Sequence, residues 1–476
     1  MTALVARRRP VRSVLPRSTP GRTFSGAAAA MVLACCLAAV IAVVFGGLGG
    51  DFQSTGQRDA PEVDAATGLY FSLNDMDAQV ANVLLVGGDP RLAGDRSQDL
   101  AIYQRDRLTA DQDLQQAAVT AAGSAAAQRQ LRSALNGIGQ YEALAAEAIL
   151  ADQQAASAAG RAPAASLGYY RQATALMQAG VLPAVASLTS VSAAELDATY
   201  QQGRTTALTG ITVVTVTGLA ALAVLVALQA YLAVRYRRLM NPALIAATVI
   251  TLGLTAAAAG QLGAEAGHLK VAKQDAFDSI IALTQARAVS YDANADESRY
   301  LVDPGQAAQY QQAFLTKSQR LAAVGDVGIF GYDAALTADI GAYRADNADV
   351  RFGGYLGAEF HNITFPGERA AAVRTLLAYQ VYERYDRVLR ALAKRNLAAA
   401  VAFDIGTAPG QSNWAFNRYD AALSSVTAIN QDAFVSAVQA GQGGVGDWSG
   451  TVPAVAAALI AALIVIGVWP RLMEYH

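Results

Sequence analysis

Four stretches of the chain contain no charged residue, and each is rich in Ala, Val, Leu and Ile. They cover residues 23–50, 205–234, 239–264 and 448–470. Each is long enough to supply the roughly 20 residues that a helix needs to cross a bilayer. The middle two stretches are nearly contiguous, whereas a long polar segment follows the first and another precedes the last. The pattern therefore predicts four transmembrane helices and two large polar lobes.

The predicted boundaries follow from this pattern. We expect a cytoplasmic basic tail at 1–25, transmembrane helices at 26–48, 208–234, 243–264 and 448–469, a cytoplasmic basic loop at 235–242 and a cytoplasmic tail at 470–476. Helical bundles are expected at 49–207 and 265–447. An uncleaved first helix is favoured over a processed leader, because its apolar stretch is longer than the apolar region of a signal peptide.

The charge distribution predicts the orientation of the chain. The short segments are basic: they contain Arg7, Arg8, Arg9, Arg12, Arg17 and Arg22 in the tail, and Arg235, Arg237 and Arg238 in the central loop. Residues 51–207 hold ten Arg against seventeen acidic residues, and residues 261–450 hold sixteen basic against twenty acidic residues. Cytoplasmic loops carry an excess of Lys and Arg. We therefore expect a multi-pass protein of the cell membrane, with cytoplasmic termini and both lobes extracytoplasmic.

Both lobes show helical periodicity, which predicts an all-α membrane protein with two extracytoplasmic four-helix bundles. In the second lobe the pattern predicts a buried stripe and a solvated remainder. The stripe is Leu377, Val381, Tyr385, Val388 and Leu392, and the solvated positions are Glu383, Arg384, Arg387, Arg390 and Lys394. In the first lobe Leu131, Leu135 and Ile138 form the expected stripe. Helix breaks are expected at 87–90, 123, 160–163, 303–305, 361–367 and 406–410, where Gly and Pro gather.

The two lobes also resemble each other in sequence, which suggests an internal repeat. With an offset of 215 residues, Asp77 and Ala78 align with Asp292 and Ala293, and one deleted residue then aligns Asp89-Pro90 with 303–304. The identities are sparse. The matching order of span, bundle and span is the stronger argument for a duplication.

The sequence shows few residues suited to catalysis. It has three His and two Cys, and the cysteines, Cys35 and Cys36, lie together in the first span. No spacing indicates a metal site, a nucleophile with its base, or a phosphate-binding loop. The pairs Asp75/Asp77 and Asp296/Glu297 are interpreted as solvated charges. We therefore expect no enzymatic activity, no cofactor and no nucleic-acid partner.

Two sets of residues are candidates for binding. Arg384 and Arg387 lie near Tyr382, and arginines beside tyrosines can hold a carboxylate with two hydrogen bonds. A solvated helix face is the favoured alternative. In the central loop, Arg235 together with the arginines at 237 and 238 could contact a cytoplasmic partner, or could only set the topology and contact lipid head groups.

The layout resembles two known families. The lobes resemble the four-helix sensor domains of chemoreceptors and histidine kinases, whose first helix often ends in a turn like 88–90. The whole chain resembles the actinobacterial GlnX family in its four spans, its two outer helical domains and its basic tail at 470–476. That resemblance implies an extracytoplasmic amino-acid-binding lipoprotein and a soluble cytoplasmic Ser/Thr kinase as partners.

Three functions remain open at this point. The leading hypothesis is a non-enzymatic signal coupler between an extracytoplasmic solute-binding protein and a cytoplasmic effector. A structural scaffold of the cell envelope and a direct small-molecule receptor are the alternatives. The sequence leaves the ligand, the partner surfaces and oligomerisation open.

Overall fold

The computed structural model describes residues 19–120, 125–236 and 241–473. In these ranges the chain is helical and contains no strand, which confirms the all-α prediction. Four of the helical segments are long and apolar enough to cross a membrane, as predicted: Gly21–Val86, Ala164–Arg235, Pro242–Val302 and Ser412–Pro470. The chain divides into two compact units.

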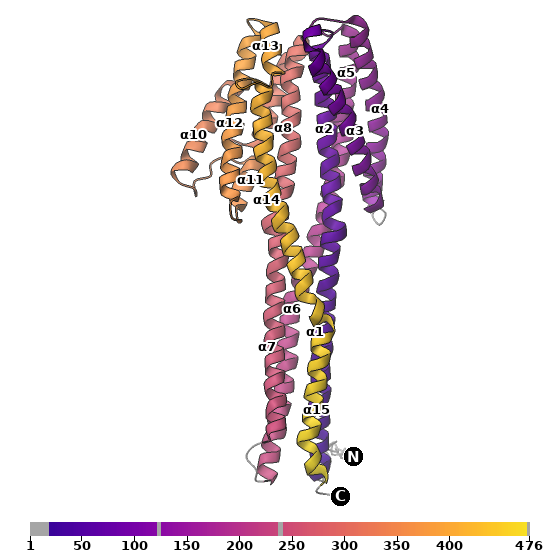
Figure 1. Ribbon diagram of the computed structural model, residues 1–476, viewed down its shortest axis with the longest axis vertical. Coiled ribbons are helices and arrows are strands. Elements are labelled where there is room, and N and C mark those ends of the chain that lie inside the picture. The colour runs from indigo at the N-terminus through magenta and orange to yellow at the C-terminus, as the bar shows by residue number, and fades with distance from the viewer. Residues whose placement is uncertain (1–18, 121–124, 237–240, 474–476) are drawn as a thin grey trace, which may run out of the picture. The chain divides into compact units, whose positions relative to one another are not determined.

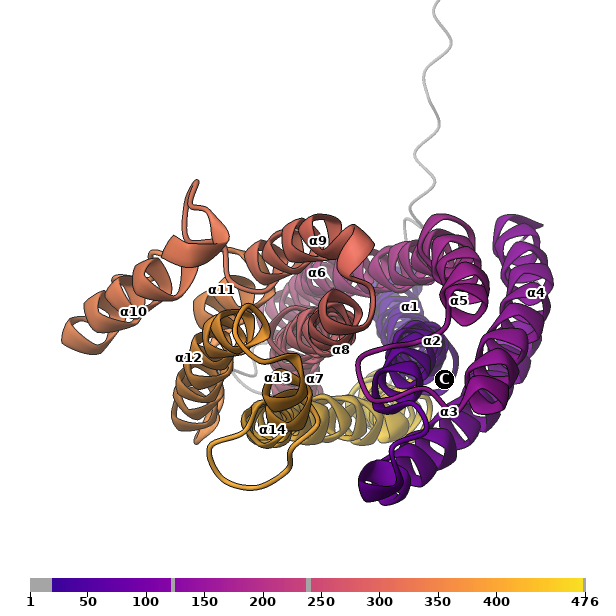
Figure 2. The ribbon, with the colours of Figure 1, turned by 90° about the horizontal axis from the view of Figure 1, so that it is seen from above.

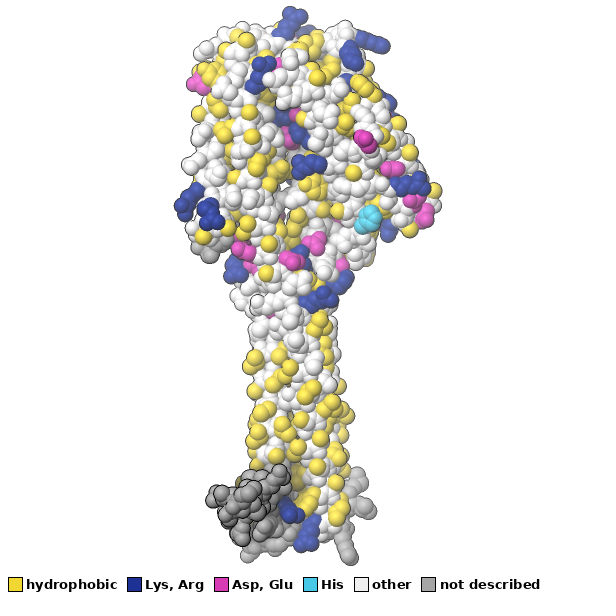
Figure 3. Space-filling view, turned by 180° about the vertical axis from the view of Figure 1, so that it is seen from behind, with side chains coloured by type: hydrophobic (Ala, Val, Ile, Leu, Met, Phe, Trp, Pro, Cys, Tyr) yellow, Lys and Arg dark blue, Asp and Glu magenta, His cyan; other side chains and the backbone are white. Residues whose placement is uncertain are grey.

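The first unit, called the membrane unit, comprises residues 1–52, 201–269 and 440–476. Its helices are α1 (Thr19–Ser54), the end of α6 (Leu182–Tyr236), α7 (Pro242–Lys270), the end of α14 (Ser412–Gly446), the 3-10 turn η7 (Asp447–Ser449) and α15 (Thr451–Met473). Figure 1 shows the α-helices. They pack through a core of Ala, Leu and Ile side chains that includes Ala30, Leu225 and Ile464. On the face shown in Figure 3, apolar side chains cover the middle of these helices, as expected for contact with lipid.

Small residues bring the helices of the membrane unit close together. A Cβ atom added at Gly218 would clash with the side chain of Thr255. Polar side chains also join the helices: Asn241 donates to the carbonyl of Gly467 over 2.7 Å. Both devices are typical of helix packing inside a membrane.

The second unit, called the lobed unit, comprises residues 53–200 and 270–439. The first lobe (53–200) contains η1 (Thr55–Asp59), α2 (Ala60–Val86), η2 (Pro90–Leu92), α3 (Ala93–Thr120), α4 (Ala125–Ala155), α5 (Ala164–Leu176), η4 (Met177–Val181) and the start of α6. The second lobe (270–439) contains η5 (Val271–Phe277), α8 (Asp278–Val302), η6 (Pro304–Gln306), α9 (Ala307–Leu321), α10 (Ile329–Ala345), α11 (Gly354–Asn362), α12 (Glu368–Ala393), α13 (Leu397–Asp404) and most of α14 (Ser412–Gly446).

The helix breaks fall largely where Gly and Pro predicted them. At the end of α2, Gly87 adopts φ 58°, and a Cβ there would come within 2.7 Å of the carbonyl oxygen of Ser157. Asp89 then caps η2 by accepting a hydrogen bond of 3.0 Å from the amide of Arg91. The break expected at Gly123 lies outside the described residues. In the second lobe, the described residues form seven α-helices where the sequence predicted four. A further loop separates α9 from α10, and the short helices α11 and α13 lie in the connections between longer helices.

The helices α2 and α8 lie side by side in the centre of the lobed unit, and the other helices surround them (Figure 2). As a result the two lobes share one core, in which Leu84 and Leu85 of the first lobe join Leu301 and Leu389 of the second. A second core lies within the second lobe and is rich in Tyr and Phe, including Tyr379 and Phe416. The two segments that the sequence separates by two spans therefore fold as one body.

The buried face of α12 differs from the predicted stripe. Leu376, Tyr379 and Leu389 are fully buried, whereas Val388 is 39% exposed and Leu377 is half-buried. Glu383 and Arg390, which the sequence placed in solvent, are also buried. The true stripe is offset by one position, because buried polar side chains interrupt its apolar pattern. In α4, Leu131 and Ile138 are buried as predicted, but Leu135 is 47% exposed.

Candidate functional site

The central helices α2 and α8 carry buried polar side chains on all of their faces. Every residue from Ser72 to Val86 is buried, and so is every residue from Asp292 to Arg299. The interpretation of Asp75/Asp77 and Asp296/Glu297 as solvated charges was therefore wrong. These residues are polar at positions where a helix surrounded by other helices has no solvent-facing side.

The guanidinium group of Arg299 is the centre of the first polar cluster. It donates hydrogen bonds to Asp77 over 2.7 Å, to Asp292 over 3.0 Å and to the hydroxyl of Tyr170 over 2.9 Å, and it also contacts Asp296. Its side chain is 1% exposed, as is that of Asp77. Because Asp77 and Tyr170 belong to the first lobe and Arg299 to the second, these bonds join the lobes.

Further charged contacts extend this cluster between the lobes. Arg171 of the first lobe holds Asp303 of the second with two hydrogen bonds, of 2.6 and 2.8 Å. Lys317 binds Asp292 over 2.8 Å. Burial acts to raise the pKa of Asp292, but the charges of Lys317 and Arg299 lower it to about 2. Burial raises the pKa of Asp77 in spite of the neighbouring Arg299. The first cluster is thus a nearly balanced set of fixed charges.

A second cluster beside it contains more acids than bases. Glu297, Glu383, Asp386 and Asp404 are buried near a single buried base, Arg390, which pairs with Asp386 over 2.6 Å. Burial is the largest cause that raises the pKa of Glu383 to about 8 and that of Asp404 to about 7. Burial and the charge of Asp386 also raise the pKa of Glu297 well above its usual range. Burial therefore favours the protonated form of these carboxyl groups.

The hydrogen bonds of the second cluster also link the lobes. The hydroxyl of Ser298 lies 2.7 Å from the side-chain oxygen of Asn82 and 3.0 Å from a carboxylate oxygen of Asp404. Tyr382 donates to Glu297 over 3.1 Å. One oxygen of Glu297 and one of Asp404 have no hydrogen-bond partner among the described residues. Burying a carboxylate without hydrogen-bond partners is unfavourable in free energy, so the protonated form of the side chain is favoured at these positions.

The structure places the predicted binding residues in different environments. Tyr382 is fully buried, whereas Arg384 and Arg387 lie on the outer face of α12. Arg387 forms a salt bridge of 3.0 Å with Asp333 of α10. The three side chains therefore do not meet in one pocket, and their role in ligand binding stays a prediction. Arg235 lies at the end of α6, and the arginines at 237 and 238 fall outside the described residues.

The most connected residue of the site, Arg299, was missed by the sequence analysis. The sequence feature that indicates a buried polar segment is the density of polar residues. Within 292–299, charged residues fall on several helical faces instead of one. A solvated helix keeps an apolar stripe, and this segment has none that is continuous. Within the described residues, no group of three His, Cys, Asp or Glu side chains is placed to hold a metal ion.

Residues 51–201 match the model of an actinobacterial sensor domain. The matched range nearly coincides with the first lobe, residues 53–200. Comparisons with curated proteins and with solved structures found no match. The family match supports an actinobacterial sensor protein and a role in sensing or signalling, and the four apolar helices indicate that the protein is a membrane protein.

Proposed function

We propose that this protein is a non-enzymatic transmembrane signal coupler. It would sense a solute, or a solute-binding protein, outside the cell and pass the signal to a cytoplasmic effector such as a Ser/Thr kinase. The sensor-domain match at 51–201 carries the proposal. The central helix of the matched segment, α2, also provides Asp77 for the buried bonds to the second lobe.

The course of the helices suggests how a signal would travel. The segments Gly21–Val86 and Pro242–Val302 each join a predicted span to a central helix of the lobed unit. A shift of α2 against α8 could therefore be passed along both segments as sliding or rotation of packed helices. The π-helical turns η1 and η5 lie where the lobes begin, and such turns are frequent at functional sites.

We also propose that the two lobes are duplicated extracytoplasmic domains. Both central helices follow a π-helical turn and precede a 3-10 turn that starts at a proline, Pro90 or Pro304. Asp77 and Asp292, which the sequence offset aligns, both bind Arg299. A duplicated pair of helices that meet across a shared interface would account for this correspondence.

The partners follow from the resemblance to the GlnX family and from charge. The basic cytoplasmic segments, with Arg235 and the arginines at 237 and 238, would attract an acidic surface on the effector. Outside, an amino-acid-binding lipoprotein would contact the lobed unit. Both partners are proposals about this chain.

Signalling can be tested in the native host by adding external glutamate. Phosphorylation of the substrates of cytoplasmic Ser/Thr kinases would be measured in cells with the wild-type chain, without the chain, and with Arg237→Gln and Arg238→Gln together. Arg235 and the N-terminal arginines keep the orientation in that variant. We expect loss of the response without the chain and a weaker response in the variant. A response that persists in cells lacking the chain would refute the coupling function.

A further inference from the structure

The second lobe has an open cavity of about 350 Å³ between α12 and α14. Its lining residues are Arg374, Leu377, Ala378, Val381, Trp414, Ala415, Arg418 and Ala422. On each helix these positions recur at helical spacing, so one face of α12 meets one face of α14. The cavity exists because three of the facing residues are alanines, which leave the space that larger side chains would fill.

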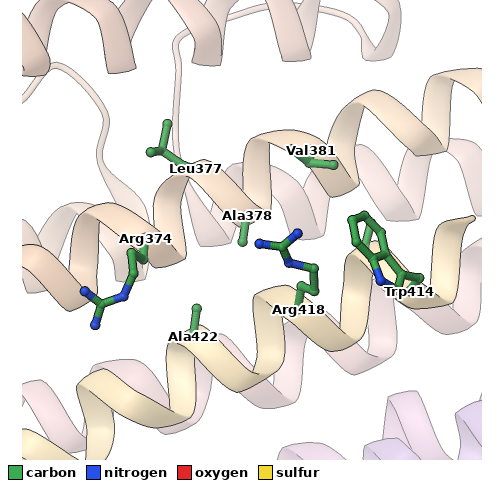
Figure 4. Close-up of a pocket in the computed structure, with 8 residues that line it drawn as sticks. Arg374, Leu377, Ala378, Val381, Trp414, Arg418 and Ala422 are labelled. Carbon is green, nitrogen blue, oxygen red and sulfur yellow. The ribbon is translucent and has the colours of Figure 1, made fainter. Parts of the chain in front are cut away.

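Two arginines reach this cavity from opposite helices, and none of its lining residues is acidic. Figure 4 shows Arg418 extending from α14 towards Ala378 of α12, with Trp414 beside it, and Arg374 at the other end. Within the described part of the chain, no carboxylate pairs with the guanidinium group of Arg374 or Arg418. Arg387 of α12, by contrast, forms a salt bridge with Asp333.

Trp414 holds one of these arginines in position. The guanidinium carbon of Arg418 lies 4.9 Å from the centre of the indole ring. A stacked, planar guanidinium keeps its N–H groups directed outward, so less conformational entropy is lost when they bind a carboxylate. The remaining lining residues of α12, Leu377, Ala378 and Val381, are apolar.

We propose that this cavity binds a small organic carboxylate with an apolar or aromatic body. The carboxylate would accept hydrogen bonds from Arg418 and from Arg374, whose side chain must turn from the position in Figure 4 towards Arg418; guanidinium groups donate strongly to an anion. The apolar body would cover the alanines and the edge of Trp414. The cavity volume lies in the range of small-molecule sites, about 300–1,000 Å³. The proposal rests on the proposed function only in placing this lobe outside the cell.

Binding can be measured on the purified full-length chain in lipid nanodiscs. The chain has three Trp, so Trp448→Phe and Trp469→Phe leave Trp414 as the only indole reporter. The probe is 3-phenylpropionate, its neutral control is 3-phenylpropanamide, and inorganic phosphate tests for a site that needs charge alone. We expect a saturable change in fluorescence with 3-phenylpropionate at a dissociation constant below about 10 mM, and none with the two controls.

Arginine variants then locate the site, with calorimetry as a second measurement because Arg418 itself lies over the indole. Arg374→Gln and Arg418→Gln should each raise the dissociation constant about tenfold or more. Arg344→Gln is the matched control, since Arg344 is exposed on α10, which contributes no residue to the cavity, and it should leave the constant within about twofold. Ala378→Leu should fill the cavity and abolish binding without unfolding the chain.

Several results would overturn the proposal. These are no saturable binding of 3-phenylpropionate, equal binding of the amide or of phosphate, or unchanged binding in both arginine variants. Loss of binding in Arg344→Gln alone would place the site elsewhere in this lobe. Because these measurements use purified protein, they are independent of the kinase response in cells, and either proposal can fail without the other.

Discussion

At the scale of single residues, buried charge is the property that distinguishes this molecule. Arg299 and Arg390 are the largest fully buried side chains in the described residues. Each is surrounded by carboxylates, but the balance differs, because Arg299 meets several acids with the help of Lys317 whereas Arg390 pairs with Asp386 alone. The first cluster therefore joins the two lobes through ion pairs, and the second contains carboxyl groups whose pKa values are raised.

Removing the centre of the first cluster should destabilise the lobed unit strongly. Arg299→Met keeps the volume roughly constant but leaves Asp77 buried without its ion-pair partner and Asp292 with Lys317 alone. Breaking one partner out of a buried pair costs about 3–5 kcal/mol. The free energy of unfolding would be measured by chemical denaturation of the full-length chain.

The matched control for this change is Arg91→Gln, which removes an exposed arginine from its salt bridge with Asp89. Water screens an exposed ion pair, so this variant should unfold almost like the wild type. An equal decrease in the free energy of unfolding in the two variants would contradict a stabilising role of the Arg299 ion pairs.

The second cluster should make stability depend on pH. The folded-state pKa of Glu383, about 8, and that of Asp404, about 7, lie above the values of these groups in an unfolded chain. The folded state therefore binds more protons between about pH 4 and pH 8, and stability falls as pH rises through this window. Each group contributes a slope of up to roughly 1.4 kcal/mol per pH unit. We expect a lower melting temperature at pH 8 than at pH 6.

Neutral variants provide the test of this assignment. Glu383→Gln and Asp404→Asn keep the shape of the side chain but cannot release a proton, so each should flatten the decline between pH 6 and pH 8. The opposite dependence comes from Asp292, whose lowered pKa removes stability only below about pH 4. A melting temperature that rises from pH 6 to pH 8 would contradict the raised pKa values of Glu383 and Asp404.

At the scale of elements, α12 shows why the apolar pattern alone was misleading. Its buried face combines Leu376, Tyr379 and Leu389 with the polar Glu383, Asp386 and Arg390. A stripe built only from apolar residues therefore selects the neighbouring face. The same happens in α2 and α8, whose polar residues are buried because helices surround them, and no sequence period records how many neighbours a helix has.

Two adjacent residues of α12 give a direct test of the corrected face. Leu389 is fully buried in the core that the lobes share, whereas Val388 is 39% exposed. Leu389→Ala should lower the free energy of unfolding by about 2–5 kcal/mol, because it leaves a cavity. Val388→Ala, its matched control, should change it by less than about 1 kcal/mol. Chemical denaturation would compare the two, and a larger loss in Val388→Ala would restore the original stripe.

At the scale of the whole molecule, the two units differ in how they are stabilised. The membrane unit packs small and aliphatic side chains, such as Ala30 and Ile464, with few polar bonds. The lobed unit combines a shared apolar core with buried ion pairs that join its two segments. The lobes are accordingly one folding unit, and separate expression of either segment would expose its half of the interface.

The predicted orientation can be tested with single cysteines in a Cys35→Ser, Cys36→Ser background. Gln154→Cys and Ala391→Cys occupy exposed positions in the two lobes, and Met473→Cys is exposed at the end of α15. Because cytoplasmic segments carry the excess of arginine, an impermeant thiol reagent should label the two lobe positions in whole cells. Met473→Cys should be labelled only after lysis. Protection of either lobe position would contradict the extracytoplasmic assignment.

The sequence by itself determined the helical fold, the four apolar helices and most helix ends, because these depend on local composition: uncharged runs, and Gly or Pro at breaks such as Gly87-Gly88. The tertiary structure alone decided that the lobes share a core, that Asp77 meets Arg299 across 222 positions, and that Ala378 faces Ala422 beside two unpaired arginines. These features depend on which helices become neighbours. From the sequence alone, a charged residue is predicted to be solvated. Only its neighbours in the tertiary structure show whether it is buried with a partner or available to bind a ligand.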